Sequence, residues 1–137
     1  CLVGSEMCIR DSYCGKKGCV DAYCSALRLA DMEDGILEKF FVHLKEGSEE
    51  HKKVWEEYME NLALTVDNLR MIFDMDVVLG GYVGCYMEPH IPELQKRLSE
   101  LDVFERRGNY VRACGCRSEA SAFGSAIYQM EKYIESI

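Results

Sequence analysis

Hydrophobic residues recur at helical intervals through the middle of the chain. The clearest pattern follows Ser48, where apolar side chains repeat at i, i+3, i+4 and i+7, the period of one buried helix face. Ser48 and Glu50 are typical of a helix start, because they satisfy amide groups and complement the helix dipole. We predict a long helix whose stripe packs into the core rather than binding a cofactor. The stripe consists of Trp55, Tyr58, Met59, Leu62, Val66, Leu69 and Phe73.

Shorter periodic segments flank the long helix and predict further helices. Gly35 and Gly47 follow the first two of these segments and mark their ends, since glycine commonly terminates a helix. The segment Glu93–Leu101 is amphipathic, and the last segment begins with small residues that let a backbone or a ligand approach closely. The predicted flanking helices are Cys19–Ala30, Ile36–Lys45, Glu93–Leu101 and a final helix capped by Ser118 and ending at Ile137.

Two short runs have the composition of strands. The run DVVLGG, Asp76–Gly81, is β-branched and apolar between a charge and a glycine pair, which is typical of a fully buried strand in a parallel sheet. The run NYVRAC, Asn109–Cys114, predicts a second strand, and Tyr86–Pro92 predicts a proline-containing connection between the two. The order of elements favours an α/β fold in which a short sheet is covered by helices.

Composition places the chain among globular proteins. Its 137 residues are 48% hydrophobic and 29% charged, which suits one domain with a core. The formal charge of -8 argues against a non-specific grip on phosphate backbones, so another segment would have to bind DNA. No apolar run approaches the roughly 18 residues that cross a bilayer, and no secretory signal is apparent. We therefore expect a cytoplasmic protein without membrane contact.

The eight cysteines suggest reduced thiols or metal ligands rather than a disulfide scaffold. In the stretch YCGKKGCVDAYC, Tyr13–Cys24, a glycine-bearing turn separates Cys14 from Cys19. This pair is half of a zinc site, a disulfide loop or two unrelated thiols. The four residues between the cysteines are the upper end of the spacing found in zinc ligand pairs, and no nearby histidine completes a site. Cys24 is expected to pack inward. Cys85, Cys114 and Cys116 are interpreted as small apolar fillers.

The amino end has an unusual composition. The chain begins with Cys rather than Met, and its opening CLVGSEMCIRDS resembles a translated sequencing adapter. We expect residues 1–11 to be a non-native leader and part of the parent protein to lie upstream.

Three motifs in register resemble the ROK family, named for repressors, open reading frames and sugar kinases. Cys14, Gly15, Gly18 and Cys19 match the cysteine–glycine signature of that family position for position. The run LALTVDNLRMIFDMDVVLGGYVG resembles the family's long helix and the strand that ends in two glycines, and CRSEASAFGSAIYQM resembles its final helix. The resemblance covers Tyr13–Ile137.

The resemblance implies that residues 12–137 form the carboxyl-terminal lobe of an actin-like, ribonuclease-H-like sugar kinase fold. It also implies a zinc ion, held by one histidine and three cysteines, beside the sugar site. Cys14 and Cys19 stand at two of these ligand positions, whereas Ser12 stands at a third and the histidine would lie upstream. The zinc site is therefore expected to be incomplete in this chain and to bind zinc weakly.

The resemblance further implies two ligand sites. Asp21 replaces a glutamate that hydrogen-bonds sugar hydroxyls, although it equally suits a role in stabilising a helix start. Gly80 and Gly81 would let a nucleotide approach the backbone, or would merely turn the chain after a strand. The catalytic aspartate and the first phosphate loop of the kinases are expected upstream, so no catalytic residue is assigned and this fragment is expected to be inactive.

Two departures from the kinase pattern favour a sugar-responsive transcriptional repressor. Tyr82 stands where the kinases have a small residue, and Glu119 replaces an aspartate. A missing amino-terminal helix-turn-helix would then read DNA. One alternative is an ATP-dependent sugar kinase, which would use ATP and Mg²⁺, and another is a lobe that serves dimerisation through the Trp55 stripe or the last helix. The expected ligand is a monosaccharide or a derivative, and a homodimer is expected.

Overall fold

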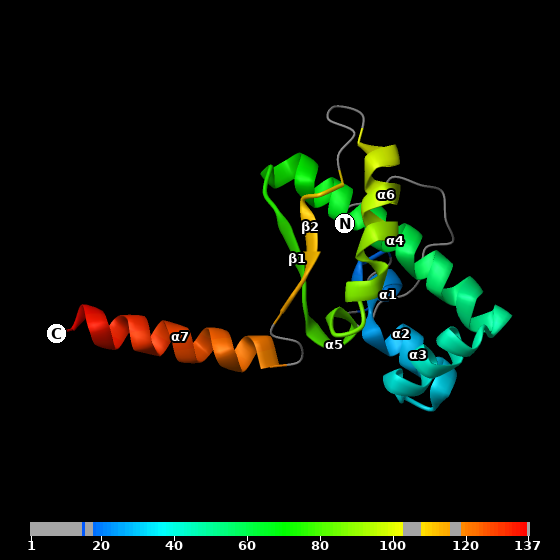
Figure 1. The fold of residues 1–137 in the computed structure, drawn as a ribbon, viewed down its shortest axis with the longest axis horizontal. Coiled ribbons are helices and arrows are strands. Elements are labelled where there is room, and N and C mark those ends of the chain that lie inside the picture. The colour runs from blue at the N-terminus through cyan, green and yellow to red at the C-terminus, as the bar shows by residue number, and fades with distance from the viewer. Residues whose placement is uncertain (1–14, 16–17, 103–107, 116–118, 137) are drawn as a thin grey trace.

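The structure is a computed structural model that describes residues 15, 18–102, 108–115 and 119–136. Most of the described chain is helical, with one two-stranded parallel sheet (Figure 1), which is compatible with the expected α/β architecture. Among the described helices, none combines the length and the apolarity needed to cross a membrane. The elements are α1 (Asp21–Cys24), α2 (Ala26–Ala30), the 3-10 helix η1 (Asp31–Glu33), α3 (Leu37–Glu46), α4 (Glu49–Phe73), β1 (Val77–Leu79), α5 (Gly81–Gly84), the 3-10 helix η2 (Glu88–His90), α6 (Ile91–Leu101), β2 (Val111–Ala113) and α7 (Ala120–Glu135).

The long helix α4 is the element on which the others pack, and it contacts α1, α3 and α6. Trp55 is 5% exposed, so the prediction of a core stripe is confirmed at this residue, and a dimer contact through the stripe stays a prediction. The prediction fails at the far end of the helix, where Phe73 is 58% exposed and Leu69 is half-buried. The described elements that cover α4 therefore stop short of its last turns. The apolar residues of α4 that are buried are Trp55, Tyr58, Met59, Leu62, Ala63 and Val66.

The predicted helix Cys19–Ala30 is two short helices. Ser25 between them is extended, with φ -82° and ψ 143°, and its side-chain oxygen accepts a hydrogen bond from the Leu27 amide at 3.2 Å. A serine in this conformation caps the start of a new helix, which explains why the apolar spacing alone missed the break. Gly35, with φ +87°, and Gly47, with φ +91°, follow η1 and α3 as predicted.

The two strands are parallel, as predicted, but β1 is not fully buried. The Val77 amide donates to the Tyr110 carbonyl at 2.8 Å, and the Cys114 amide donates to the Leu79 carbonyl at 2.8 Å. Val78 pairs with Arg112 in the register, and both side chains are exposed. With α6 packed on β2, one face of this small sheet is covered, and the face that carries Val78 stays open in the described structure.

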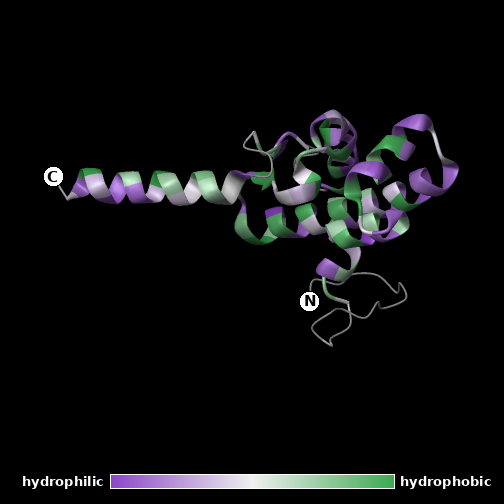
Figure 2. Cartoon of the chain, turned by 90° about the horizontal axis from the view of Figure 1, so that it is seen from below, coloured by the Kyte–Doolittle hydropathy of each residue, from purple (hydrophilic) through white to green (hydrophobic). Residues whose placement is uncertain are grey.

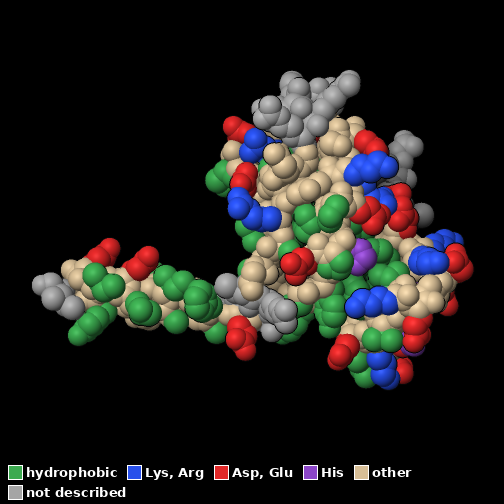
Figure 3. Space-filling view, viewed as in Figure 1, with side chains coloured by type: hydrophobic (Ala, Val, Ile, Leu, Met, Phe, Trp, Pro, Cys, Tyr) green, Lys and Arg blue, Asp and Glu red, His purple; other side chains and the backbone are tan. Residues whose placement is uncertain are grey.

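The last helix, α7, extends away from the other elements (Figure 1). It carries both hydrophobic and hydrophilic residues along its length (Figure 2), and its described side chains, from Ala122 to Ser136, are exposed. Hydrophobic side chains are visible along its surface in Figure 3. The residue at its N-cap is Glu119, and the predicted cap, Ser118, lies outside the described residues. The large apolar residues exposed on α7 are Phe123, Ile127, Tyr128, Met130, Tyr133 and Ile134.

We predict that Gly108→Ala destabilises the fold. A Cβ at Gly108 would lie 1.9 Å from the backbone carbonyl oxygen of Gln95. The backbone before β2 and the backbone of α6 would therefore have to move apart. The expected loss is about 1–3 kcal/mol of unfolding free energy, measured by urea denaturation. Gly115→Ala is the matched control, since a Cβ there meets nothing within 4 Å, and it should change stability by less than about 0.5 kcal/mol. Equal effects of the two substitutions would contradict this packing.

Candidate functional site

The first predicted site residue, Asp21, lies on the short helix α1, which is fixed to α4. The hydroxyl group of Tyr58 donates to the carbonyl oxygen of Cys24 at 3.3 Å, and the Cys24 sulfur lies 4.0 Å from the Thr65 hydroxyl. These contacts hold the end of α1 against α4. Asp21 is in the first turn of α1 and is exposed, so its carboxylate is accessible to a ligand in solution.

The thiol of Cys24 points into the protein, as predicted. Its burial raises the pKa of the thiol to about 11, although the Thr65 hydroxyl and the charge of Arg28 act in the opposite direction. Burial disfavours the thiolate, which is the form that attacks electrophiles and binds metals. Cys24 is therefore a packing residue rather than a reactive thiol.

The predicted zinc ligands are only partly described. Gly15 and Gly18 have φ of +75° and +74°, a left-handed conformation that favours glycine, and Cys19 follows them with a reduced, half-buried thiol. Cys14 lies outside the described residues. Within the described part of the chain, Cys19 belongs to no group of three metal-binding side chains. The conformations of Gly15 and Gly18 suit a half-site, and the pairing of the two thiols stays a prediction.

The second predicted pair, Gly80 and Gly81, forms the turn that follows β1. Gly81 has φ +73°, and a Cβ there would meet nothing within 4 Å, so glycine is required by the backbone and not by a close neighbour. Both glycines and Tyr82 are exposed, and Tyr82 is 75% exposed. Gly84 is different, because a Cβ there would lie 2.9 Å from the Leu79 carbonyl oxygen. The turn is thus open to solvent on one side and packed against β1 on the other.

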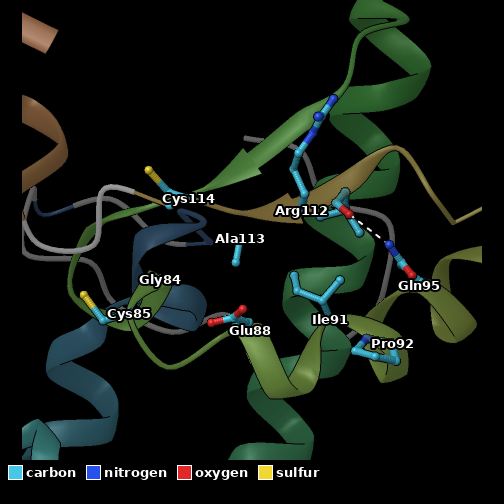
Figure 4. A pocket seen from close by; sticks show the side chains of 11 residues that line it. Gly84, Cys85, Glu88, Ile91, Pro92, Gln95, Arg112, Ala113 and Cys114 are labelled. Atoms are coloured by element: carbon cyan, nitrogen blue, oxygen red, sulfur yellow. Dashed lines mark hydrogen bonds between the residues drawn. The ribbon is translucent and has the colours of Figure 1, made fainter.

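A cavity of about 480 Å³ opens beside the carboxyl end of β2 (Figure 4). Ligands of open parallel sheets commonly bind near the carboxyl ends of the strands. Gln95 donates from Nε2 to the Val111 carbonyl at 3.0 Å and ties α6 to β2 along one wall. In Figure 4, Cys85 and Cys114 lie toward one end of the cavity and Gln95 toward the other. The lining residues are Gly84, Cys85, Glu88, Ile91, Pro92, Gln95, Val111, Arg112, Ala113, Cys114 and Gly115.

The sequence did not predict this cavity. Cys85 and Cys114 were interpreted as fillers, yet both are half-buried and line it. Asp21 and the Gly80–Gly81 pair are not part of its described lining, although Gly84 belongs to the same glycine-rich segment as the pair. One signal in the sequence points to it: Cys114 and Gly115 directly follow the second strand, as Gly80 and Gly81 follow the first.

Comparison with known proteins gives one result. The model of the ROK family matches residues 6–132 of the 137-residue chain. Neither the curated proteins nor the solved structures include a match to this chain.

We predict that Cys24 is the slowest of the described cysteines to be alkylated. With its pKa raised to about 11, little thiolate is present at about pH 8.5, so iodoacetamide should modify Cys24 more than about tenfold more slowly than Cys85. Mass spectrometry of tryptic peptides after timed alkylation measures both rates. In urea the two rates should become similar, because unfolding removes the burial. Equal rates in the folded chain would contradict the placement of α1.

Proposed function

The chain belongs to the ROK family, and from this premise we propose that it forms the sugar-sensing lobe of a transcriptional repressor. Family membership supports a repressor or a sugar kinase, and the mostly helical structure with a parallel pair of strands is compatible with part of an actin-like ATPase fold. We propose residues 12–137 as the carboxyl-terminal lobe and residues 1–11 as a non-native leader, although the family match begins at residue 6. The repressor would act in the cytoplasm, where thiols stay reduced.

The position of Tyr82 is the observation that favours a repressor over a kinase. Tyr82 directly follows the exposed Gly80–Gly81 turn, and the residue is 75% exposed on a four-residue helix. In the kinases of this family the corresponding turn is expected to accept the nucleotide. We propose that this aromatic ring, which lies beside the turn, would fill space that an adenosine would need. A sensor that has lost ATP binding tolerates such a ring.

Asp21 supports the sugar-sensing part of the proposal. Its carboxylate is exposed, and α1, which carries it, is anchored to α4 through Cys24. A carboxylate accepts hydrogen bonds from sugar hydroxyls, and bonds to a charged group are stronger than neutral ones. We propose that Asp21 binds hydroxyl groups of a monosaccharide or a derivative.

A zinc ion would have a structural role next to this sugar site. Cys14 and Cys19 would hold it together with ligands from outside the residues of this chain, and the left-handed Gly15 and Gly18 suit a tight turn between the two thiols. When bound, zinc would fix the conformation of this turn without taking part in chemistry. The turn leads directly into α1, so an ordered turn would restrict the position of Asp21.

The alternative is a sugar kinase that uses ATP and Mg²⁺. It is favoured by one observation: a Cβ at Gly81 meets nothing within 4 Å, so the backbone of the turn is open to a nucleotide. A dimerisation lobe is a further alternative, favoured by the exposed apolar residues of α7, among them Phe123 and Ile127. A homodimer is compatible with all three functions.

The deciding experiment uses the complete gene product that contains this chain. We expect it to bind an operator DNA through an amino-terminal domain, to release that DNA when a monosaccharide is added, and to show no sugar-dependent hydrolysis or transfer of the γ-phosphate of ATP. Fluorescence anisotropy of labelled promoter DNA and a coupled ATPase assay measure these activities. Sugar-dependent ATP turnover would refute the repressor and establish the kinase.

The contribution of Asp21 is tested in the same protein. Asp21→Asn removes the charge, and sugar binding should weaken by about 1.5–3 kcal/mol, roughly ten- to 150-fold, in isothermal titration calorimetry. Asp31→Asn is the matched control, since Asp31 is also exposed and lies in the 3-10 helix that follows α2. If both variants bind the sugar like the parent protein, Asp21 stabilises the helix start and does not bind sugar.

A further inference from the structure

Three polar side chains from three different elements meet where α3 ends and α4 begins. Glu33 lies in η1, His43 in the last turn of α3, and His51 in the first turn of α4. Gly47, with φ +91°, turns the chain between the two helices and brings the histidines together. Figure 1 places this region at the end of the molecule opposite α7. None of the three residues lines the cavity beside β2.

The two imidazoles converge on one carboxylate oxygen. His43 Nδ1 lies 2.7 Å from Glu33 Oε1, and His51 Nε2 lies 2.8 Å from the same oxygen. The centroids of the two rings are 5.2 Å apart. One ligand atom from each of the three residues lies within 4.8 Å of the others. The two nitrogens thus both contact Glu33 Oε1, and the three possible ligand atoms lie close enough together to surround one ion.

The ring of His51 is oriented by a second contact. Ser48 Oγ lies 2.8 Å from His51 Nδ1, and the Ser48 side chain makes no hydrogen bond to the backbone of the helix that it precedes. A serine at the N-cap usually bonds to the amide groups of the first turn. Ser48 is the N-cap of α4, as predicted, but its hydroxyl contacts the His51 imidazole instead of a backbone amide. Metal-binding histidines are commonly held in this way by a hydrogen bond at the second ring nitrogen.

We propose that Glu33, His43 and His51 form a binding site for a divalent transition metal ion, with Zn²⁺ as the best fit. Two imidazoles and a carboxylate are a common ligand set for zinc, and the fourth position would be open to water or to a ligand. Glu33 and His51 are largely buried, with side chains 16% and 10% exposed, whereas His43 is 40% exposed and gives the ion a route of entry. This site is separate from the cysteine pair Cys14 and Cys19.

The geometry requires a small adjustment for metal binding. Without an ion, the carboxylate accepts a hydrogen bond from each imidazole, and these bonds hold the pKa of Glu33 below its usual range. Ligand atoms about 2.0–2.1 Å from a tetrahedral zinc ion are about 3.3 Å apart, so each of the two nitrogens would move about half an ångström away from Glu33 Oε1. The imidazole protons would move to the other ring nitrogens, and His51 Nδ1 would then donate to Ser48 Oγ. Rotation of the partly exposed His43 side chain can supply most of this movement.

The test uses the full 137-residue chain with Zn²⁺ as the probe. The chain has three histidines, so nitrogen-15 NMR resolves each ring. We expect one equivalent of Zn²⁺ to shift His43 Nδ1 and His51 Nε2 and to leave His90 unchanged, since His90 packs on Trp55, with a centroid distance of 4.7 Å. Shifts confined to His90, or the absence of shifts at saturating Zn²⁺, would overturn the proposal.

Variants separate this site from the cysteine pair. Glu33→Gln keeps the shape of the side chain, and His43→Ala removes a partly exposed ring. Both variants should weaken zinc binding at least tenfold. Ser48→Ala removes the contact that orients His51 and should weaken zinc binding by about ten- to a hundredfold. His90→Ala is the matched control and should bind zinc like the parent chain. Circular dichroism shows whether each variant keeps its helices. In a Cys14→Ser, Cys19→Ser chain the imidazole shifts should persist; their loss would assign the zinc to the thiols and overturn the proposal.

Discussion

The structure depends on the buried face of α4. Trp55, Met59 and Val66 lie on this face at helical intervals, and each is at most 5% exposed. The face is the common partner of α1, α3 and α6, and through α6 it also supports β2. Burial of large apolar and aromatic side chains is the main stabilising contribution in a domain of this size. Each candidate site lies on an element that α4 holds in place: Asp21 on α1, the histidine cluster at the start of α4, and the cavity beside α6.

Polar contacts adjust the position of these elements on α4. Arg28 of α2 lies 2.5 Å from Glu57 of α4, and its guanidinium also donates to the Tyr23 carbonyl at 3.1 Å. Arg97 of α6 lies 2.5 Å from Glu56 on the same helix. These pairs are partly exposed, so their effect on stability is modest, and their main effect is to fix the direction of the packed helices. The apolar face provides the stability, and the arginines provide the orientation.

The sequence predicted the regular elements because their patterns are local. Spacing and composition predict the helical stripe around Trp55, the two strands, and the glycines that follow η1 and α3. These predictions are confirmed. The break at Ser25 was missed because a side-chain hydrogen bond competes with the helix at a single residue. The exposure of Val78 was missed because burial depends on what covers the sheet, which the strand itself does not encode. The exposed end of the long helix at Phe73 has the same cause.

The candidate sites were predictable only where a motif is contiguous. The cysteine–glycine turn and Gly80–Gly81 can be read from neighbouring residues, and they carried the family resemblance that the family match supports. The cavity between α6 and β2 depends on tertiary packing, as does the meeting of Glu33 with two histidines from different helices. The one local signal for the histidines is their position on either side of Gly47, and it does not indicate the carboxylate.

Amide hydrogen exchange of the full chain, measured by NMR, tests the central role of α4 most directly. If α4 is the scaffold, the slowest amides lie between Trp55 and Val66 and exchange only when the whole domain unfolds, while those of α1, α6 and β2 exchange at the same rate or faster. If the amides of α6 or β2 exchange more slowly than those of Trp55 to Val66, the fold is organised around the sheet. The account given for the positions of all three sites is then wrong.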